Sequence, residues 1–256
     1  MIKNWLILPF LLLMFLVTSC GSDDPEPGPY KRTVLVYIAG DNSLSSFAFK
    51  DLAEMKQGMQ EADATALHLL VYLDMGDSPR LVELKKSGDT VVEEVVREYE
   101  DRNSCGLEET REVFDAVFSN PNFEAESYGL IYWSHADGWI PYGEASTRWV
   151  GQDKTDGDLR MNISELVSLL KTTPHFSFIM FDACFMSSVE VAYELRNFTD
   201  YYIGSPTENP GPGAPYDKLV PLMAEDNAAV RMAQVYFASY EAIYNGGIGI
   251  SNNNWT

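Results

Sequence analysis

The sequence contains few of the residues on which metal and cofactor chemistry depends. Its 256 residues include only three cysteines and three histidines. They form no Cys-x-x-Cys pair, no zinc-type cluster and no His-Glu-x-x-His motif. An EF-hand-type calcium loop and the Gly-x-Ser-x-Gly motif of serine hydrolases are missing as well. The sequence therefore predicts no metal centre and no cofactor, and it leaves a short set of candidate catalytic side chains.

Positive charge is also scarce. Lysine and arginine together number 18, against 38 aspartates and glutamates, which gives a formal net charge of −20. A field of that sign repels nucleic acids and anionic membrane surfaces, so neither is expected as a partner. It favours cationic ligands only weakly at physiological salt. The charge thus excludes partners more than it identifies one.

The longest apolar run is too short for a comfortable membrane span. Residues 5–17 follow Lys3 and have about the length of the apolar part of a secretory signal. The run ends in Leu-Val-Thr-Ser-Cys-Gly, which resembles a bacterial lipobox with Cys20 as the lipidated residue. Residues 1–19 are therefore predicted to be a lipoprotein signal peptide. The alternative is an ordinary secretory signal.

Residues 20–31 are predicted to form the lipidated N-terminus and a flexible tether. The stretch GSDDPEPGPY is rich in proline, glycine and acidic residues, a composition that cannot form a packed core. It resembles the surface-export tethers of Bacteroidetes lipoproteins. We therefore expect a lipoprotein anchored to the outer membrane of a Gram-negative bacterium, facing the periplasm or the cell surface. Only its lipid would touch the membrane.

Residues 32–256 alternate short apolar runs with segments of helical spacing. Strands are expected over residues 33–39, 67–73, 128–133, 176–181 and 201–204, and helices over 46–60, 106–118, 162–170, 217–224 and 228–244. Residues 80–98 predict a hairpin at the sheet margin, and 140–159 a long loop. The pattern predicts one α/β domain with a mostly parallel sheet and helices on both faces. A further strand is expected near residues 246–251.

Cys184 lies where an apolar strand passes into the next helical segment. The chain reads FSFIMFDACFMSSVEVAYEL from residue 176, with Val189, Val191 and Leu195 at helical spacing. A thiol at a helix N-terminus is shifted towards thiolate, the nucleophilic form, by the helix dipole and the free N–H groups. The alternative for a lone cysteine is a small buried thiol. The other cysteine of the domain, Cys105, could be free or could pair with Cys184.

His135 is the candidate partner of Cys184. His68 lies inside a predicted strand and His175 beside Pro174, so both have structural explanations. His135 and Cys184 each follow a strand, and ligands of parallel α/β sheets bind outside the carboxyl ends of the strands. Such a pair suits acyl transfer, with the N–H groups of Ala136 and Cys184 as oxyanion donors. The alternative is a pair with a structural role.

Several segments together resemble the clostripain family of cysteine peptidases. They are YGLIYWSHADGW, WVGQD, FIMFDACFMSSVEVAYEL and SPTENPGPGAPYD, and His135 precedes Cys184 by 49 residues. The resemblance implies a caspase-like three-layer sandwich that lacks its C-terminal strand or strands. It implies a monomeric cysteine endopeptidase acting on peptides or proteins, with Cys184 as nucleophile and His135 as general acid and base. Calcium is required by some members of the family.

The same resemblance suggests how a substrate is chosen. In members specific for arginine or lysine, the acid at the position of Asp182 lines the pocket for the residue before the cleaved bond. The alternative is a strand-end carboxylate that accepts backbone N–H groups. Pro212 stands where such members carry a further acid, and Ala136 replaces the usual glycine, which would be costly if a positive φ were needed there. These departures support an alternative function, a catalytically inactive surface lipoprotein that binds peptides or proteins.

Some family members mature by cleavage between the histidine and the cysteine. Arg148, Lys154 and Arg160 lie in the segment that would be cut, and each offers a basic residue there. Cleavage at one of them is a hypothesis that the resemblance alone supports.

Overall fold

A seven-stranded sheet forms the centre of the protein. The computed structural model describes residues 30–76, 78–139, 149–154 and 157–244. The sheet order is β4-β3-β2-β1-β5-β8-β9. Its strands are β1 (Tyr30–Ala39), β2 (Leu67–Asp74), β3 (Arg80–Ser87), β4 (Thr90–Glu98), β5 (Ala125–Trp133), β8 (Phe176–Asp182) and β9 (Thr199–Ile203). All pairs are parallel except β2–β3 and β3–β4, which confirms the predicted parallel sheet and its marginal hairpin.

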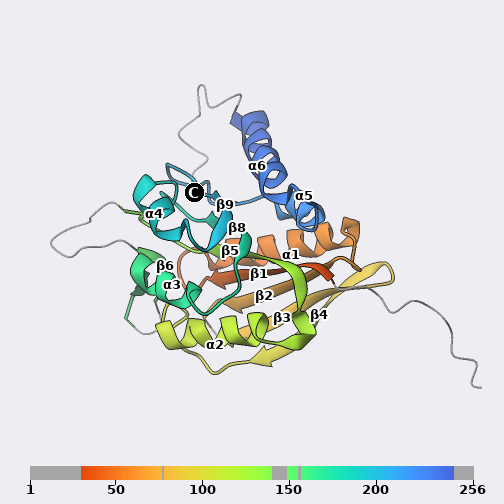
Figure 1. Cartoon of the computed structure of the whole chain (residues 1–256), viewed down its shortest axis with the longest axis horizontal. Coiled ribbons are helices and arrows are strands. Elements are labelled where there is room, and N and C mark those ends of the chain that lie inside the picture. The colour runs from red at the N-terminus through yellow and green to blue at the C-terminus, as the bar shows by residue number, and fades with distance from the viewer. Residues whose placement is uncertain (1–29, 77, 140–148, 155–156, 245–256) are drawn as a thin grey trace, which may run out of the picture.

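Helices cover both faces of this sheet (Figure 1). One face carries α1 (Ser45–Glu61), α5 (Tyr216–Leu219), the short 3-10 turn η2 (Val220–Leu222) and α6 (Ala228–Tyr244). The other carries α2 (Leu107–Phe118), α3 (Ile163–Leu170) and α4 (Val189–Leu195), with the 3-10 turn η1 (Pro121–Phe123) before β5. The predicted α/β architecture of three layers is confirmed.

The central strand β1 shows why two separate cores form. Val34, Val36 and Ile38 are fully buried against α1 and its neighbours, while Leu35 and Tyr37 are fully buried on the other face. Successive side chains of a strand point to opposite faces, so a strand covered on both sides reads as a continuous apolar run. This is why the first strand could be predicted from sequence.

The segment expected to be one long loop contains a second small sheet. β6 (Trp149–Asp153) pairs antiparallel with β7 (Leu159–Asn162), with a bulge between Val150 and Gln152. The expectation of a loop over 140–159 was therefore wrong for its second half. Residues 140–148 and 155–156 lie outside the described residues. An isolated bridge between Ala136 and Val150 attaches this β6–β7 hairpin to the chain that follows β5.

Two helices differ from their sequence-based description. α4 begins at Val189, whose side chain is 77% exposed and not part of the apolar stripe. The apolar spacing over 228–244 predicts that Val230, Phe237 and Ile243 face inward on α6, but they are 41%, 68% and 65% exposed. The core contacts of α6 are made by Ala228, Ala229 and Met232, and the half-buried Val235 and Tyr236 pack against the same core. One face of α6 is therefore buried, and Phe237 and Ile243 lie outside it.

The predicted N-terminal segments lie almost entirely outside the described residues. Those residues include neither the signal peptide (1–19) nor Cys20, and the strand expected near 246–251 also falls outside them. The tether was predicted to extend to residue 31, but β1 already begins at Tyr30. Within the described part of the chain, no helix is long and apolar enough to cross a membrane.

Candidate active site

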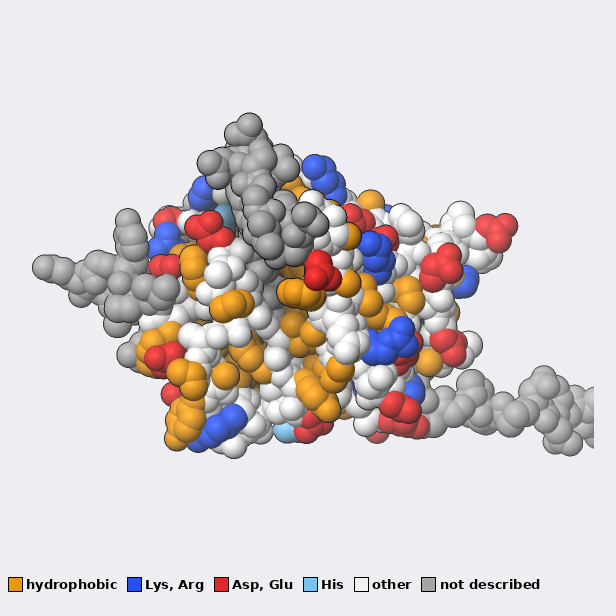
Figure 2. All heavy atoms as spheres, turned by 90° about the horizontal axis from the view of Figure 1, so that it is seen from above, with side chains coloured by type: hydrophobic (Ala, Val, Ile, Leu, Met, Phe, Trp, Pro, Cys, Tyr) orange, Lys and Arg blue, Asp and Glu red, His pale blue; other side chains and the backbone are white. Residues whose placement is uncertain are grey.

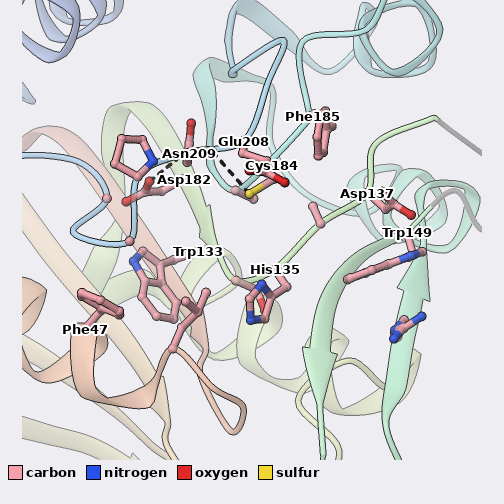
Figure 3. Close-up of a pocket in the computed structure, with 18 residues that line it drawn as sticks. Phe47, Trp133, His135, Asp137, Trp149, Asp182, Cys184, Phe185, Glu208 and Asn209 are labelled. Carbon is pink, nitrogen blue, oxygen red and sulfur yellow. Dashed lines mark hydrogen bonds between the residues drawn. The ribbon is translucent and has the colours of Figure 1, made fainter. Parts of the chain in front are cut away.

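Two neighbouring parallel strands bring the candidate residues together. β5 pairs with β8, and their last residues, Trp133 and Asp182, lie opposite each other. His135 and Cys184 each follow two residues later, at the edge of the sheet where parallel folds bind ligands. Both line one cavity of about 530 Å³. Figure 3 shows the two side chains facing this cavity from the loops that follow these strands.

The β6–β7 hairpin fixes the backbone at His135. The N–H of Gly151 donates to the His135 carbonyl at 2.9 Å, and the N–H of Asp137 donates to the Trp149 carbonyl at 3.3 Å. Gly151 has a φ of +84°, and a Cβ there would lie 2.6 Å from the Tyr132 hydroxyl. Only glycine permits this close approach with this backbone. The hairpin therefore sets the position from which the imidazole enters the cavity.

The His135 ring is half-buried and has a hydroxyl partner. Its Nε2 lies 2.9 Å from Ser43 Oγ, in the turn between β1 and α1. Burial lowers the pKa of His135, and the positive charges of Lys154 and Arg160 lower it further, against a smaller opposite effect of Asp158. An unperturbed histidine has a pKa of about 6.5. His135 is therefore neutral at neutral pH and available as a base.

Cys184 is not at a helix N-terminus, so one reason for expecting a thiolate was wrong. α4 starts only at Val189, after Phe185 has turned the chain with a φ of +57°. The thiol is half-buried, and its Sγ accepts the N–H of Asn209 at 3.3 Å. Burial raises the pKa of Cys184, and Glu208 and Asp182 add to this effect. The resting group is a thiol that needs a base.

The turns that carry the two residues pack against each other. Gly138 has a φ of +57°, and a Cβ there would lie 2.1 Å from the Phe185 carbonyl oxygen. The N–H of Phe185 in turn donates to Thr207 at 3.0 Å, which ties it to the loop after β9. Three loops thus meet around the cavity, and a shift in one of them moves the others.

Both expected oxyanion donors are left without a partner among the described residues. The bridge between Ala136 and Val150 uses the N–H groups of Gly151 and Asp137, and not that of Ala136. No described residue accepts the N–H of Cys184 either. Ala136 is not among the described residues with a positive φ, so the loss of glycine at this position causes no backbone strain.

Asp182 is buried and its carboxylate is surrounded by donors. Oδ2 accepts the N–H of Ala214 at 2.9 Å and the hydroxyl of Tyr216 at 3.1 Å. Oδ1 accepts the hydroxyl of Tyr236 at 3.1 Å and the side-chain amide of Asn209 at 3.3 Å. Burial raises the pKa of Asp182 even though these bonds oppose it. About four acceptor positions exist on a carboxylate, and all are used here.

An aromatic wall lies beside Asp182. Phe47 and Trp133 line the cavity, and Trp133 donates its indole N–H to Asp51 Oδ2 at 2.7 Å. Asp51 is fully buried in α1, and its pKa is raised to about 9 by burial and by the nearby Asp182. Pro212 does not line this cavity, although Gly211 and Gly213 do.

Several residues of this site were not identified from sequence. The positions of Ser43 and Ser45 in the sequence predict a helix cap, yet the N-cap of α1 is Leu44 and has no side-chain cap bond. Asp51 could have been suspected, because it follows Phe47 by one helical turn on the same face of α1. Nothing in the sequence signalled that Trp149 and Arg160 line the cavity, since their hairpin was not predicted.

The remaining cysteine lies apart from the cavity. Cys105 is buried beneath Gly151 and the Tyr132 ring, and both Cys105 and Cys184 are free thiols. The alternative of a disulfide between them was therefore wrong. In the part of the chain that the structure describes, no group of three or more His, Cys, Asp or Glu residues could hold a metal ion.

A family model and a curated protein each match most of this chain. The sequence model of the clostripain family matches residues 36–251. Clostripain of Hathewaya histolytica is 26% identical over 221 residues, which cover 74% of this chain and 41% of that protein. The chain thus spans less than half the length of this curated relative.

Two solved structures extend the comparison. A secreted C11 cysteine protease from Bacteroides thetaiotaomicron, solved with an irreversible peptide inhibitor, is 52% identical with a TM-score of 0.81, over 89% of this chain and 64% of its own. An inactive zymogen C11 protease from Parabacteroides distasonis is 37% identical with a TM-score of 0.73, over 84% of this chain and 60% of its own. In both cases the match leaves more than a third of the solved chain without a counterpart here.

Proposed function

The chain belongs to the clostripain family, and from this premise we propose that it is a cysteine endopeptidase with Cys184 as nucleophile and His135 as general acid and base. The observation that carries the proposal is the shared cavity, which His135 and Cys184 enter from adjacent parallel strands. The family relation alone would be compatible with loss of activity. The preserved pair, with a base that is neutral at neutral pH, supports catalysis.

Catalysis proceeds in two acyl-transfer steps. As Cys184 Sγ attacks the peptide carbonyl carbon, its proton passes to the neutral His135 ring. The imidazolium then gives this proton to the departing amine nitrogen, which leaves a thioester on Cys184. Water attacks the thioester with His135 as base, and the carboxylic acid and the free thiol are regenerated. The N–H groups of Ala136 and Cys184 bind the oxyanion in both steps.

The proposal extends to a basic residue before the cleaved bond. The aromatic wall of Phe47 and Trp133 suits the long apolar stem of lysine or arginine, and cations bind favourably to aromatic faces. Asp182 lies beside this wall and supplies negative charge. The opposing observation is that internal donors already occupy its carboxylate, so a guanidinium or ammonium group would have to displace the weakest of them, Asn209 at 3.3 Å.

Labelling with peptidyl probes that carry a reactive carbon tests this proposal. Probes with arginine, lysine or a small residue next to the reactive group are compared on the wild type, Cys184→Ala and His135→Ala. We expect labelling of the wild type by the basic probes, complete loss in Cys184→Ala and a large loss in His135→Ala. Binding of peptides without any labelling would instead support the inactive lipoprotein. Labelling by the small-residue probe alone would exclude the basic preference.

Processing within the chain would involve the β6–β7 hairpin. Arg160 lies within β7, where it is paired with Gln152 and its guanidinium stacks over the Trp149 ring at 4.3 Å. Lys154 follows the end of β6, and Arg148 lies outside the described residues. A protease reaches exposed loops more readily than paired strands, so of the two described residues Lys154 is the better site for maturation. An active preparation with one intact chain would contradict cleavage.

The proposed location is the outer membrane, through a lipid on Cys20. The support is the lipobox-like sequence, and the related Bacteroides protease is described as secreted. Mass spectrometry of the mature N-terminus tests it, because a lipidated cysteine and a simple signal-peptidase product differ in mass.

A further inference from the structure

We propose that Ser43 is a positioning residue of this active site, whose hydroxyl holds His135 Nε2 so that Nδ1 is the ring nitrogen presented to Cys184. The inference rests on the proposed peptidase function. It assigns a role to a residue outside the two strands that carry the pair. The geometry behind it is the 2.9 Å contact between Ser43 Oγ and His135 Nε2.

The hydroxyl of Ser43 forms a hydrogen bond with His135 and does not cap helix α1. A serine just before a helix usually accepts an N–H from the first turn. Here the N-cap position of α1 belongs to Leu44, and no side chain caps the helix. Ser43 thus does not contribute the local stabilisation that its position in the sequence predicts.

Asn42 holds the turn that carries Ser43. Its buried side-chain amide donates to the carbonyls of Ala39 at 3.0 Å and Gln152 at 2.8 Å. Its Oδ1 accepts the N–H of Leu44 at 2.9 Å. Ser43 therefore lies between Asn42, which is tied to the end of β1 and to the β6–β7 hairpin, and Leu44, whose N–H is tied to Asn42. That same hairpin holds the His135 carbonyl, so donor and acceptor are fixed on one framework.

The other two histidines show what is different about His135. His68 Nδ1 lies 2.7 Å from Glu83, and His175 Nε2 lies 2.9 Å from Asp200. In both cases the partner of the ring is a carboxylate side chain. Among the described residues, the only hydrogen-bond partner of the His135 ring is the uncharged hydroxyl of Ser43. This uncharged partner orients the ring and stabilises its protonated form less than a carboxylate would.

The contact holds Nε2 at Ser43, so Nδ1 is left to carry out the proton transfer. A hydroxyl can donate or accept, and in the tautomer that serves catalysis Nε2–H donates to Ser43 Oγ and the lone pair lies on Nδ1. When Cys184 Sγ bonds to the carbonyl carbon, its proton moves to Nδ1, and the same proton later leaves with the amine. Without the hydroxyl, the ring can rotate and can carry its proton on Nδ1, a form that cannot accept the thiol proton. Ser43 thereby acts through His135 and does not contact the substrate.

The test compares Ser43→Ala, Ser43→Thr and the matched control Ser46→Ala. Ser46 is exposed in the first turn of α1, close to Ser43 in sequence and outside the cavity. With a peptide substrate or probe that the wild type accepts, we expect kcat/KM to fall about tenfold in Ser43→Ala through kcat, the loss that one oriented hydrogen bond produces. Ser43→Thr retains a hydroxyl and should recover most of the rate. Ser46→Ala should match the wild type.

A spectroscopic measurement on the same proteins separates orientation from general damage. Nitrogen-15 spectra of histidine side chains distinguish the two neutral tautomers of His135. The wild type, Ser43→Thr and Ser46→Ala should show the proton on Nε2, and Ser43→Ala should show a mixture. The acid limb of the rate profile should move to lower pH in Ser43→Ala, because the lost acceptor stabilised the imidazolium. The groups that otherwise act on the ring, Lys154, Arg160 and Asp158, are unchanged.

Failure of the role of Ser43 and failure of the proposed peptidase function give different results. If the wild type shows no labelling that depends on Cys184, the peptidase proposal itself fails. If the wild type is active but Ser43→Ala equals Ser46→Ala in rate, tautomer and pH profile, only the role of Ser43 is overturned. An Nδ1–H tautomer in the wild type would overturn it as well.

Discussion

At the scale of single residues, burial shifts every important acid and base of this site away from its charged form. The pKa of Cys184 is raised, that of His135 is lowered, and those of Asp182 and Asp51 are raised. The resting catalytic pair, Cys184 and His135, is therefore uncharged, although the protein carries many charges. A neutral thiol beside a neutral imidazole is a pair in which a proton moves only when a substrate carbonyl is attacked. Activity should accordingly require His135 as a base at the moment of attack.

Asp51 allows the most direct test of how burial shifts the pKa of an acid in this site. Its folded-state pKa of about 9 lies above the ordinary value, so its contribution to stability is complete in acid and is lost as pH rises towards 9. Asp51→Asn keeps an acceptor for the Trp133 indole N–H and removes the ionisation. We expect the variant to be more stable than the wild type at pH 8 by about 2 to 4 kcal/mol, and by much less at pH 5.

Urea unfolding at the two pH values measures the effect of Asp51→Asn. Asp115→Asn serves as the matched control, because Asp115 is exposed on α2 and has no partner in the core. Other buried acids, such as Asp74, also destabilise the wild type as pH rises, but they are present in all three proteins. A variant no more stable than the wild type at pH 8 would show that Asp51 is ionised in the folded protein.

At the scale of elements, the β6–β7 hairpin supports the active site. It holds the His135 carbonyl through Gly151, it binds Asn42 through Gln152, and Trp149 and Arg160 form part of the cavity wall. The hairpin makes no strand pair with the large sheet, apart from the single bridge to Ala136. A distortion of the hairpin should therefore affect catalysis more than the fold.

Gly151→Ala tests this dependence. A Cβ at Gly151 would lie 2.6 Å from the Tyr132 hydroxyl and 2.8 Å from Cys105 Sγ, so the strand must move away and take the His135 carbonyl with it. We expect a loss of at least about 2 kcal/mol in stability, from positive φ and overpacking together. Labelling of Cys184 by a peptidyl probe should slow by more than tenfold, because misplacement of about 1 Å can cost a hundredfold in rate.

Gly157→Ala is the control for the effect of a positive φ alone. Gly157 has a φ of +105° in the same hairpin, and no heavy atom lies within 4 Å of a Cβ placed there. It should lose only about 1 to 2 kcal/mol and keep its labelling rate. Equal labelling rates in the two variants would mean that the hairpin does not position His135.

The elements also show what the sequence could and could not predict. The large sheet was predictable because strands such as β1 and β8 are buried on both faces and read as unbroken apolar runs. β6 was not, because a bulge at Gly151 interrupts the alternation of a strand that has only one partner. The start of α4 was placed too early, because Phe185 reverses the chain with a positive φ that its side chain gives no reason to expect.

The candidate site could also be predicted only in part from the sequence. His135 and Cys184 follow buried strands, so sheet topology alone places them together. Ser43 and Asn42 act through a turn whose partners lie about a hundred residues away in sequence, and nothing local indicates those contacts. Residues that act through tertiary contacts leave no periodic signal.

At the scale of the whole molecule, net charge and exposed apolar surface have opposite effects on self-association. Figure 2 looks onto the side of the molecule on which α4, α5 and α6 lie in Figure 1, and hydrophobic side chains gather across its middle. Among the described residues, Phe237 and Ile243 on α6 are exposed apolar side chains, as is Tyr201 on β9, the last strand of the sheet order given above. Exposed apolar patches favour association. The net charge of −20 opposes it.

The balance between charge repulsion and apolar attraction should depend on salt concentration. At about 0.1 M ionic strength the Debye length is about 10 Å, and like-charged molecules repel each other before their surfaces meet. At about 1 M it falls to about 3 Å, so the repulsion is lost while the apolar surface is unchanged. We therefore expect a monomer at low salt and reversible association at high salt. Sedimentation equilibrium at the two salt concentrations measures both states.

Two charge-matched variants locate the surface responsible. Phe237→Glu places a carboxylate within the exposed apolar residues of α6, whereas Val92→Glu places the same charge on β4, at the opposite margin of the sheet. Both change the net charge equally, so general repulsion cannot distinguish them. We expect Phe237→Glu alone to keep the protein monomeric at high salt, because it removes apolar contact where β9 and α6 lie together. Equal effects of the two variants would assign the association to net charge and not to this surface.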